Sequence, residues 1–226
     1  GAPIFIDQVV SLPSHSLIHQ SMAAEQSKIV VNADGFGLAW YGERAEPGLY
    51  RDVFPAWSDP NLRSIIAQVR SHLFLAHVRA STGTATSRNN CHPLSGRWSF
   101  MHNGQIGGFD GIRRDADMAI PDDLYDQRKG ATDSEALFLI AVAEGLDSDP
   151  VGAISRATAR LEQLSKLKGC APQVRIAATF SDGKRIFALR YSSDQKSPTV
   201  FHRWNDQLGG RAVVSEPLET GELGWQ

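Results

Sequence analysis

The sequence predicts an α+β fold, in which strands pair as antiparallel hairpins and helices cluster between the pairs. Three observations carry this prediction. Short apolar segments of strand length flank turn signals, the helical segments lie between these hairpins, and no repeating strand–helix–strand pattern occurs. With 226 residues and no linker or internal repeat, the chain is expected to form a single domain over residues 1–226.

The first half of the chain predicts one helix and four strands. Asp59 followed by Pro60 is a helix start signal, and apolar residues follow at helical spacing as far as Val69. The polar segment 81–96 is rich in Ser, Thr, Asn and Gly, so we expect a long surface loop there. The strands predicted in this half are residues 36–42, 49–54, 74–80 and 97–102.

The second half predicts two helices and four strands. Thr132 and Glu135 have the spacing of a capping box, and the helix that follows, as far as Leu146, is apolar on nearly every face and therefore buried. Asp149 before Pro150 starts the second helix. The strands predicted here are residues 174–180, 185–191, 199–204 and 211–215, the first two joined by a hairpin signal at residues 182–183.

Composition argues against several classes of partner. The chain has 23 basic and 25 acidic residues, so it offers no basic field, and neither nucleic acid nor a membrane surface is expected to bind. The longest apolar run, residues 136–143, is far shorter than the ~18 residues that span a bilayer. Two cysteines and no visible secretion signal indicate a cytoplasmic protein.

Five polar clusters stand at strand ends, loop starts or the beginning of a helix, where a rigid scaffold can present side chains to a ligand. Two of their residues, Arg79 and Asp133, are charged candidates. Arg79 shares a strand face with His77 and either holds a carboxylate or forms a structural ion pair. Asp133 either holds an ammonium group or accepts from N–H groups in the first turn of its helix. The clusters are residues 32–37, 77–83, 90–93, 102–106 and 132–135.

Asn103 and Gly104 are candidates for an oxyanion site. A side-chain amide and an N–H group that glycine leaves open can cradle an oxyanion, although the same dipeptide is also a common hairpin turn. Cys91 and His92 are adjacent and point to opposite faces of an extended chain, so they form a poor nucleophile–base pair. No metal-ligand spacing or nucleotide-binding loop occurs, and no metal or cofactor is expected.

Together these clusters resemble the class-II glutamine amidotransferases, which are amino-terminal-nucleophile (Ntn) hydrolases. The motifs H-x-R-x-x-T, N-x-H-P, H-N-G-x-I and T-D-x-E of that family all occur here in this order, from His77 to Glu135. The segment 32–37, the lack of an attached synthase domain and residues 215–217 are most similar to the stand-alone bacterial, YafJ-like branch. The resemblance implies a four-layer α/β/β/α sandwich of two mainly antiparallel sheets.

The resemblance also implies a role for each matching residue. Arg79 would bind the α-carboxylate of glutamine and Asp133 its α-ammonium group. Asn103 and Gly104 would form the oxyanion hole, and Thr82 would have a minor place in the substrate pocket. The histidines at motif positions are expected to support the site without touching substrate, and they are His77, His92 and His102.

The implied reaction is hydrolysis of the γ-amide of glutamine through a cysteine thioester. The family's nucleophile is an amino-terminal cysteine, whereas residue 1 here is Gly1. Members of this branch place that cysteine a few residues before a Gly-x-Pro-Ile segment, which residues 1–4 match. We therefore expect a cysteine before Gly1, and an inactive protein without one.

The expected ligand is glutamine or another γ-glutamyl compound. The resemblance includes no domain that would use the ammonia. It therefore implies that ammonia is released or passed to a partner protein. Two alternatives remain open: a hydrolase of another γ-glutamyl amide or peptide, and a non-catalytic, glutamine-binding regulatory subunit. Arg79 and Asp133 would bind the glutamyl end of the ligand in each case.

Overall fold

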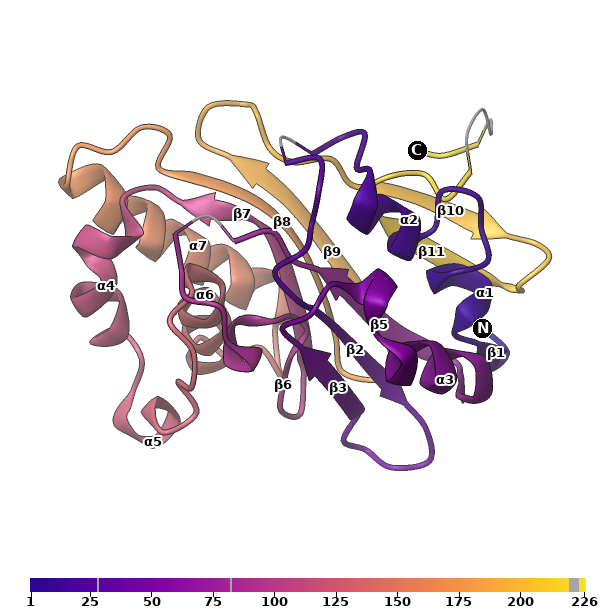
Figure 1. The fold of residues 1–226 in the computed structure, drawn as a ribbon. Helices are drawn as coiled ribbons and strands as arrows, with labels where there is room; N and C mark the ends of the chain where they lie inside the picture. Colours follow the sequence, from indigo (N-terminus) through magenta and orange to yellow (C-terminus); the bar gives the residue numbers. More distant parts are fainter. Residues whose placement is uncertain (28, 82, 220–223) are drawn as a thin grey trace. The chain divides into compact units, whose positions relative to one another are not determined.

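The structure, a computed structural model, describes residues 1–27, 29–81, 83–219 and 224–226 (Figure 1). Within these ranges the chain divides into two compact units. Unit 1 comprises Gly1–Met101, Thr179–Ala188 and Thr199–Gln226, and unit 2 comprises His102–Ala178 and Leu189–Pro198. The single domain over residues 1–226 stays a prediction.

Unit 1 is built around a three-stranded antiparallel sheet in the order β3-β2-β5. The central strand β2 pairs Phe36 with Asp52 of β3 and with Val78 of β5. Unit 1 also contains two smaller antiparallel pairs, β1–β4 and β10–β11. The bounds are β1 (Ile4–Phe5), β2 (Phe36–Tyr41), β3 (Gly48–Asp52), β4 (Arg70–Ser71), β5 (Leu73–Val78), β10 (Phe201–Asn205) and β11 (Gly210–Val214).

Short helices pack against this sheet. Helix α3 starts as predicted, because Asp59 accepts the N–H of Leu62 at 2.7 Å and Pro60 takes the first helical position. The helical elements of unit 1 are α1 (Asp7–Val10), α2 (Leu17–Met22), η1 (Ala56–Ser58), α3 (Pro60–Gln68) and η2 (Arg88–Asn90). The core that they share with the sheet consists of Ile6, Val10, Ile18, Phe36, Leu38, Ala56, Leu62 and Ile66.

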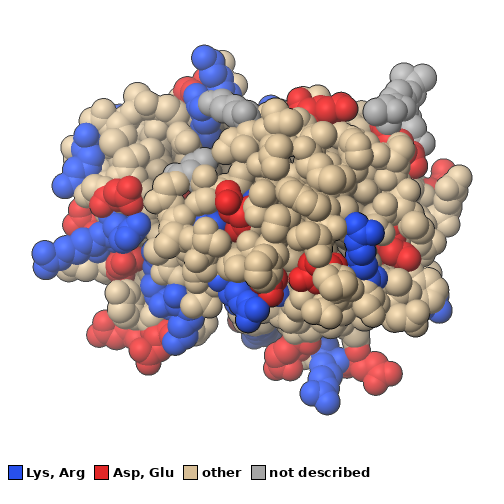
Figure 2. All heavy atoms as spheres, viewed as in Figure 1, with Lys and Arg blue, Asp and Glu red and all other residues tan. Residues whose placement is uncertain are grey.

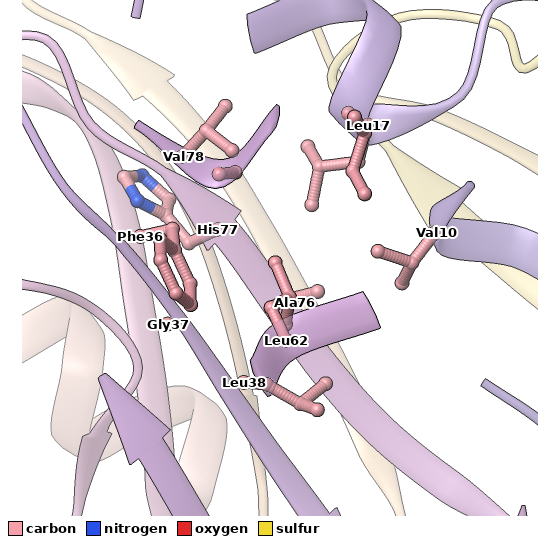
Figure 3. A pocket seen from close by; sticks show the side chains of 11 residues that line it. Val10, Leu17, Phe36, Gly37, Leu38, Leu62, Ala76, His77 and Val78 are labelled. Carbon is pink, nitrogen blue, oxygen red and sulfur yellow. The ribbon is translucent and has the colours of Figure 1, made fainter. Parts of the chain in front are cut away.

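A small apolar pocket of about 10 Å³ remains in this core (Figure 3). Val10, Leu17 and Leu62 line it from the helices, and residues of β2 and β5 line it from the sheet. Of its lining residues, His77 alone carries a polar side chain. Charged groups of a substrate would therefore find no partner in this pocket.

Unit 2 is mainly helical. Helix α6 packs against α4, α5 and α7, and it is buried along most of its length, as its apolar sequence predicts (Figure 1). Asp149 caps α7 by accepting the N–H of Gly152 at 3.0 Å. The bounds are α4 (Phe109–Asp117), α5 (Asp122–Tyr125), α6 (Asp133–Ala143) and α7 (Pro150–Leu167).

A second sheet has the strand order β6-β7-β8-β9, and three of its strands run from one unit into the other. Its elements confirm the α+β class predicted from the hairpin signals. The bounds are β6 (Leu94–Ser95), β7 (Ser99–Ile106), β8 (Val174–Ser181) and β9 (Ile186–Ser192).

The predicted surface loop at residues 81–96 is only partly correct. The segment contains η2 and β6, and its residues Asn90, Cys91 and His92 are buried. The reason is that its polar groups find partners within the protein: the Asn90 side chain donates to the Ala85 carbonyl at 2.7 Å. Polar composition alone therefore predicted too much exposure.

Candidate active site

Arg79 lies directly after β5 and is only 6% exposed. Its backbone pairs with the segment before β2, because its N–H donates to the Gly35 carbonyl at 2.8 Å. Its guanidinium donates to three neutral oxygens: the Asp34 carbonyl at 3.3 Å, Ser81 Oγ at 3.1 Å and Thr84 Oγ1 at 2.6 Å.

In the part of the chain that the structure describes, no aspartate or glutamate forms an ion pair with Arg79. The structural ion pair considered from the sequence is therefore not found in these ranges. A buried cation without a counter-charge is costly, so the Arg79 environment favours an incoming anion.

Asp34 holds the loop that surrounds the Arg79 guanidinium. Its carboxylate accepts the N–H of Ser81 at 2.7 Å, and the Ser81 hydroxyl donates to the Thr84 carbonyl at 2.6 Å. The sequence marked Asp34 as part of a polar cluster but gave no signal for Ser81 or Thr84 as partners of Arg79. Thr82, predicted to border the substrate, lies outside the described residues.

His77 and His92 lie together in unit 1. Their ring centroids are 4.8 Å apart and the ring planes meet at 66°. His92 is buried and His77 half-buried. This packing is compatible with the supporting role predicted for both histidines.

Asn103 and Gly104 lie within strand β7, so the alternative of a hairpin turn at this dipeptide is wrong. Gly104 has a φ of +149°, and a Cβ there would lie 2.0 Å from the Arg175 carbonyl oxygen. Only glycine fits this position. Both residues are exposed, and the Asn103 amide makes no side-chain hydrogen bond to another described residue. The donor is therefore available to a ligand.

Asp133 is the first residue of α6, and Thr132 caps that helix by accepting the N–H of Glu135 at 3.2 Å. The two carboxylate oxygens of Asp133 accept the N–H of Ile106 at 2.7 Å and the N–H of Ser134 at 2.8 Å. Asp133 thus satisfies a first-turn N–H group, and no lysine or arginine of the described ranges pairs with it. This geometry is compatible with both interpretations of Asp133, which either binds an ammonium group or accepts N–H groups at the start of its helix.

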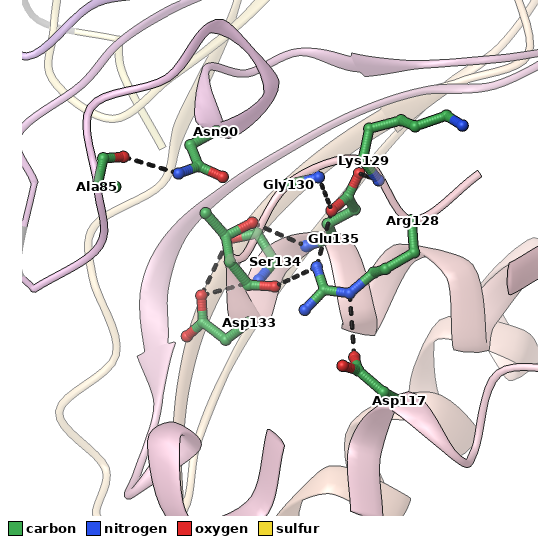
Figure 4. Close-up of polar contacts among 10 residues, drawn as sticks. Ala85, Asn90, Asp117, Arg128, Lys129, Gly130, Asp133, Ser134 and Glu135 are labelled. Carbon is green, nitrogen blue, oxygen red and sulfur yellow. Dashed lines mark hydrogen bonds and ion pairs between the residues drawn. The ribbon is translucent and has the colours of Figure 1, made fainter. Parts of the chain in front are cut away.

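Glu135 behaves differently although it is two residues away. Its buried carboxylate accepts the N–H groups of Lys129 and Gly130 at 3.0 and 2.8 Å, and it pairs with Arg128 at 2.7 Å (Figure 4). Arg128 also pairs with Asp117 at 3.0 Å. The capping box is therefore half right, because the carboxylate turns to residues 129–130 instead of to the N-cap. No sequence pattern pointed to Arg128.

Cys91 is fully buried, and its Sγ lies 3.4 Å from the Asp52 carbonyl oxygen. Burial raises the pKa of the Cys91 thiol, which is the opposite of what activates a nucleophile. The geometry agrees with the expectation that Cys91 is not the nucleophile.

On the face drawn in Figure 2, basic and acidic side chains are intermixed and form no broad patch of one sign. Over the described ranges, no helix combines the length and apolar character needed to cross a membrane. The same ranges hold no cluster of three His, Cys, Asp or Glu side chains suited to a metal ion.

The model of the glutamine amidotransferases class-II family matches residues 10–200, most of the chain. The chain belongs to this family. A solved class-II domain protein from Silicibacter pomeroyi, called a glutamine aminotransferase, is 51% identical, with a TM-score of 0.79 over 96% of this chain and 86% of that one. The match confirms the predicted Ntn-type α+β fold and the predicted family, the class-II glutamine amidotransferases.

Two curated relatives of this amidotransferase chain differ in name. A probable glutamine amidotransferase from Saccharomyces cerevisiae is 37% identical over 61% of this chain and 41% of its own length, so this chain spans about two fifths of that relative. A γ-glutamyl-hercynylcysteine sulfoxide hydrolase from Mycolicibacterium smegmatis is 26% identical over 100% of this chain and 87% of its own length.

Proposed function

We propose that this amidotransferase chain hydrolyses the γ-amide of glutamine through a thioester on an amino-terminal cysteine. The observation that carries the proposal is a pair of charges without partners. In the described ranges the buried guanidinium of Arg79 has no acidic partner, and the Asp133 carboxylate pairs with no lysine or arginine. The α-carboxylate and α-ammonium groups of an amino acid supply the two missing counter-charges.

Each residue then has one task. Arg79 binds the α-carboxylate and Asp133 the α-ammonium group. The Asn103 amide and the Gly104 N–H donate to the oxyanion that forms on the γ-carbonyl oxygen. Thr82 borders the substrate. The three motif histidines keep these groups in place, and they are His77, His92 and His102.

In the proposed reaction the cysteine sulfur attacks the γ-carbonyl carbon, and the thiol proton passes by way of the α-amine of that cysteine to the leaving nitrogen. The carbon–nitrogen bond breaks and ammonia leaves. Water then attacks the thioester, which releases glutamate and returns a proton to the sulfur. Ammonia is set free or taken up by a partner protein.

The direction of the β1–β4 ladder supports an amino-terminal nucleophile. Ile4 pairs with Ser71 and Phe5 with Arg70 in antiparallel register. Residues before Ile4 would therefore run in the direction in which the chain continues from Ser71 through β5 to Arg79. A cysteine a few residues before Gly1 would be directed towards the end of β5 that carries Arg79.

A second candidate substrate is another γ-glutamyl amide or peptide. Arg79 and Asp133 would contact only the glutamyl end, and one relative is named as a hydrolase of a γ-glutamyl compound. The two candidates differ in the leaving group. Glutamine releases ammonia, whereas a γ-glutamyl peptide releases an amine.

The test uses the natural full chain, with its amino terminus established by intact mass. We expect glutamate and ammonia from glutamine, and no turnover by protein whose mass shows a start at Gly1. Faster release of an amine from a γ-glutamyl dipeptide would select the second candidate. Binding of glutamine without turnover by the natural chain would instead indicate a regulatory subunit.

Asn103→Ala tests the oxyanion hole. Loss of one donor should lower kcat about 10²–10³-fold and leave KM nearly unchanged, provided that acylation limits turnover. Gln105→Ala is the matched control, because Gln105 is exposed and lies on the same face of β7 two residues further on. Equal kcat values for the two variants would remove Asn103 from the mechanism.

A further inference from the structure

We infer that Ser134 is a positioning residue whose hydroxyl fixes the His102 ring beneath Gly104. The inference rests on the proposed function for its catalytic consequence, because Gly104 is one of the two proposed oxyanion donors. Ser134 lies in the T-D-x-E motif, but its side chain had no predicted role. Its geometry can be tested without any substrate.

The His102 ring is held from two sides. It is 3% exposed, its Nδ1 lies 2.9 Å from Ser134 Oγ, and its Nε2 lies 3.4 Å from the Arg175 carbonyl oxygen. A Cβ built on Gly104 would lie 2.7 Å from His102 Nε2 and 2.0 Å from that same carbonyl oxygen. The ring and the carbonyl therefore form the surface on which Gly104 rests.

The partners determine the tautomer. A carbonyl oxygen only accepts hydrogen bonds, so Nε2 must carry the proton that points to Arg175. Burial lowers the pKa of His102, which favours a neutral ring with a bare Nδ1. Nδ1 then accepts from the Ser134 hydroxyl.

This arrangement also matters for Asp133. Ser134 Oγ lies 3.3 Å from Asp133 Oδ1, further than from His102. Both acceptors are within hydrogen-bond distance, but a hydroxyl has one proton, which the nearer His102 Nδ1 accepts. The Asp133 carboxylate is then held by the N–H groups of Ile106 and Ser134. That carboxylate therefore keeps lone pairs that can accept hydrogen bonds from the substrate ammonium group.

Loss of the Ser134 hydroxyl should therefore affect the transition state more than substrate binding. The ring would lose its contact with Ser134 Oγ, and Gly104 would lose its fixed position. The backbone bonds to Asp133 would persist. In Ser134→Ala we expect kcat to fall about ten- to hundredfold with KM nearly unchanged.

The kinetic experiment uses the natural full chain and two comparisons. Ser134→Thr keeps the hydroxyl and should restore most of kcat. Ser181→Ala removes another buried hydroxyl, which donates to the Arg185 carbonyl at 2.7 Å, and should leave kcat unchanged. A wild-type kcat in Ser134→Ala at an equal melting temperature would overturn the inference.

The second experiment requires no turnover. Two-bond ¹H–¹⁵N correlations of ¹⁵N-histidine-labelled protein distinguish the two tautomers, and the His102 signals are assigned by their loss in His102→Gln. We expect an Nε2–H ring at neutral pH that loses this single tautomer in Ser134→Ala. An Nδ1–H or a charged ring in an active enzyme overturns the inference alone, whereas the expected tautomer in an inactive natural chain overturns the proposed function alone.

Discussion

The side chains of Arg79 and Arg128 are both buried but have opposite kinds of partner. Arg79 is 6% exposed and donates to neutral oxygens, whereas the Arg128 side chain is 5% exposed and pairs with Asp117 and Glu135. Removing a cation from water is costly unless an anion is supplied in its place. The fold supplies the anions for Arg128 within unit 2, and it supplies none for Arg79 in the described ranges.

The two carboxylates of the T-D-x-E motif repeat the contrast. Glu135 is neutralised by Arg128 and by two backbone N–H groups, while Asp133 accepts from two N–H groups and pairs with no lysine or arginine of the described ranges. A charged side chain that has an ion-pair partner within the protein stabilises the fold. A charge that it leaves unpaired is available to a substrate, and mutations should separate the two kinds.

The largest expected effect is that of Arg128→Ala on stability. The substitution leaves the buried carboxylate of Glu135 without its cation, so the free energy of unfolding should fall by about 3–5 kcal/mol. Urea denaturation measures it. The double variant Arg128→Met, Glu135→Met should recover part of the loss, because it removes both charges. A loss below about 1 kcal/mol in Arg128→Ala, the range of surface ion pairs, would contradict the comparison.

Arg79→Ala should show the opposite pattern. It removes a charge-assisted contact of about 1.5–3 kcal/mol, so KM for glutamine should rise roughly ten- to hundredfold. No carboxylate of the described ranges loses its partner, and the free energy of unfolding should change little. Arg79→Lys is the control that keeps the charge but loses the planar fork. A stability loss as large as that of Arg128→Ala, with KM unchanged, would make Arg79 part of the scaffold.

The contrast between the arginines was only partly visible in the sequence. Asp59-Pro60 predicted the start of α3 because the capping contacts are local. The motif order predicted Arg79 and Asp133 as candidates. That Glu135 pairs with Arg128 could not be predicted, because the loop between them has no periodicity from which a contact could be inferred.

Two further misses have the same physical origin. Helices α1 and α2 have 4 and 6 residues, too few to show helical periodicity, and tertiary packing forms them. The residues from Asn90 to His92 were expected at the surface because their segment is polar. Their contacts come from distant parts of the chain: the Arg51 guanidinium, 40 residues away, donates to the Cys91 carbonyl. Such partners appear only once the fold is known.

Asp133→Asn should have a smaller effect than Arg79→Ala. The N–H groups of Ile106 and Ser134 bind different oxygens of Asp133, so the amide keeps an acceptor for only one of them, and the free energy of unfolding should fall by about 0.5–1.5 kcal/mol. Helix α6 keeps its start, because Thr132 provides the cap. Loss of the charge should raise KM for glutamine about tenfold, a change of about 1.4 kcal/mol. An unchanged KM would mean that Asp133 only accepts hydrogen bonds at the start of α6 and does not bind substrate.

The smallest effect is expected at a third arginine, Arg175, whose ion pair with Asp194 is partly open to solvent. The Arg175 guanidinium lowers the pKa of Asp194 to about 2. The folded state thus favours the charged carboxylate, and the pair stabilises the protein fully above the ordinary aspartate pKa of about 3.9. As the pH falls from there through about 2, that contribution is lost. The difference in unfolding free energy between wild type and Asp194→Asn should therefore be constant from pH 7 to about 5 and shrink as the pH falls further.

Salt separates this exposed pair from the buried pair of Arg128. In about 1 M NaCl the screening length is about 3 Å, so the effect of Asp194→Asn should shrink while that of Arg128→Ala persists. Denaturation with urea, which is uncharged, allows both measurements at fixed salt. If the two effects shrank equally, solvent would reach Arg128 as easily as Arg175. Burial would then not distinguish the ion pair of Arg128 from an exposed ion pair. The lack of an acidic partner for Arg79 would no longer indicate that Arg79 binds substrate.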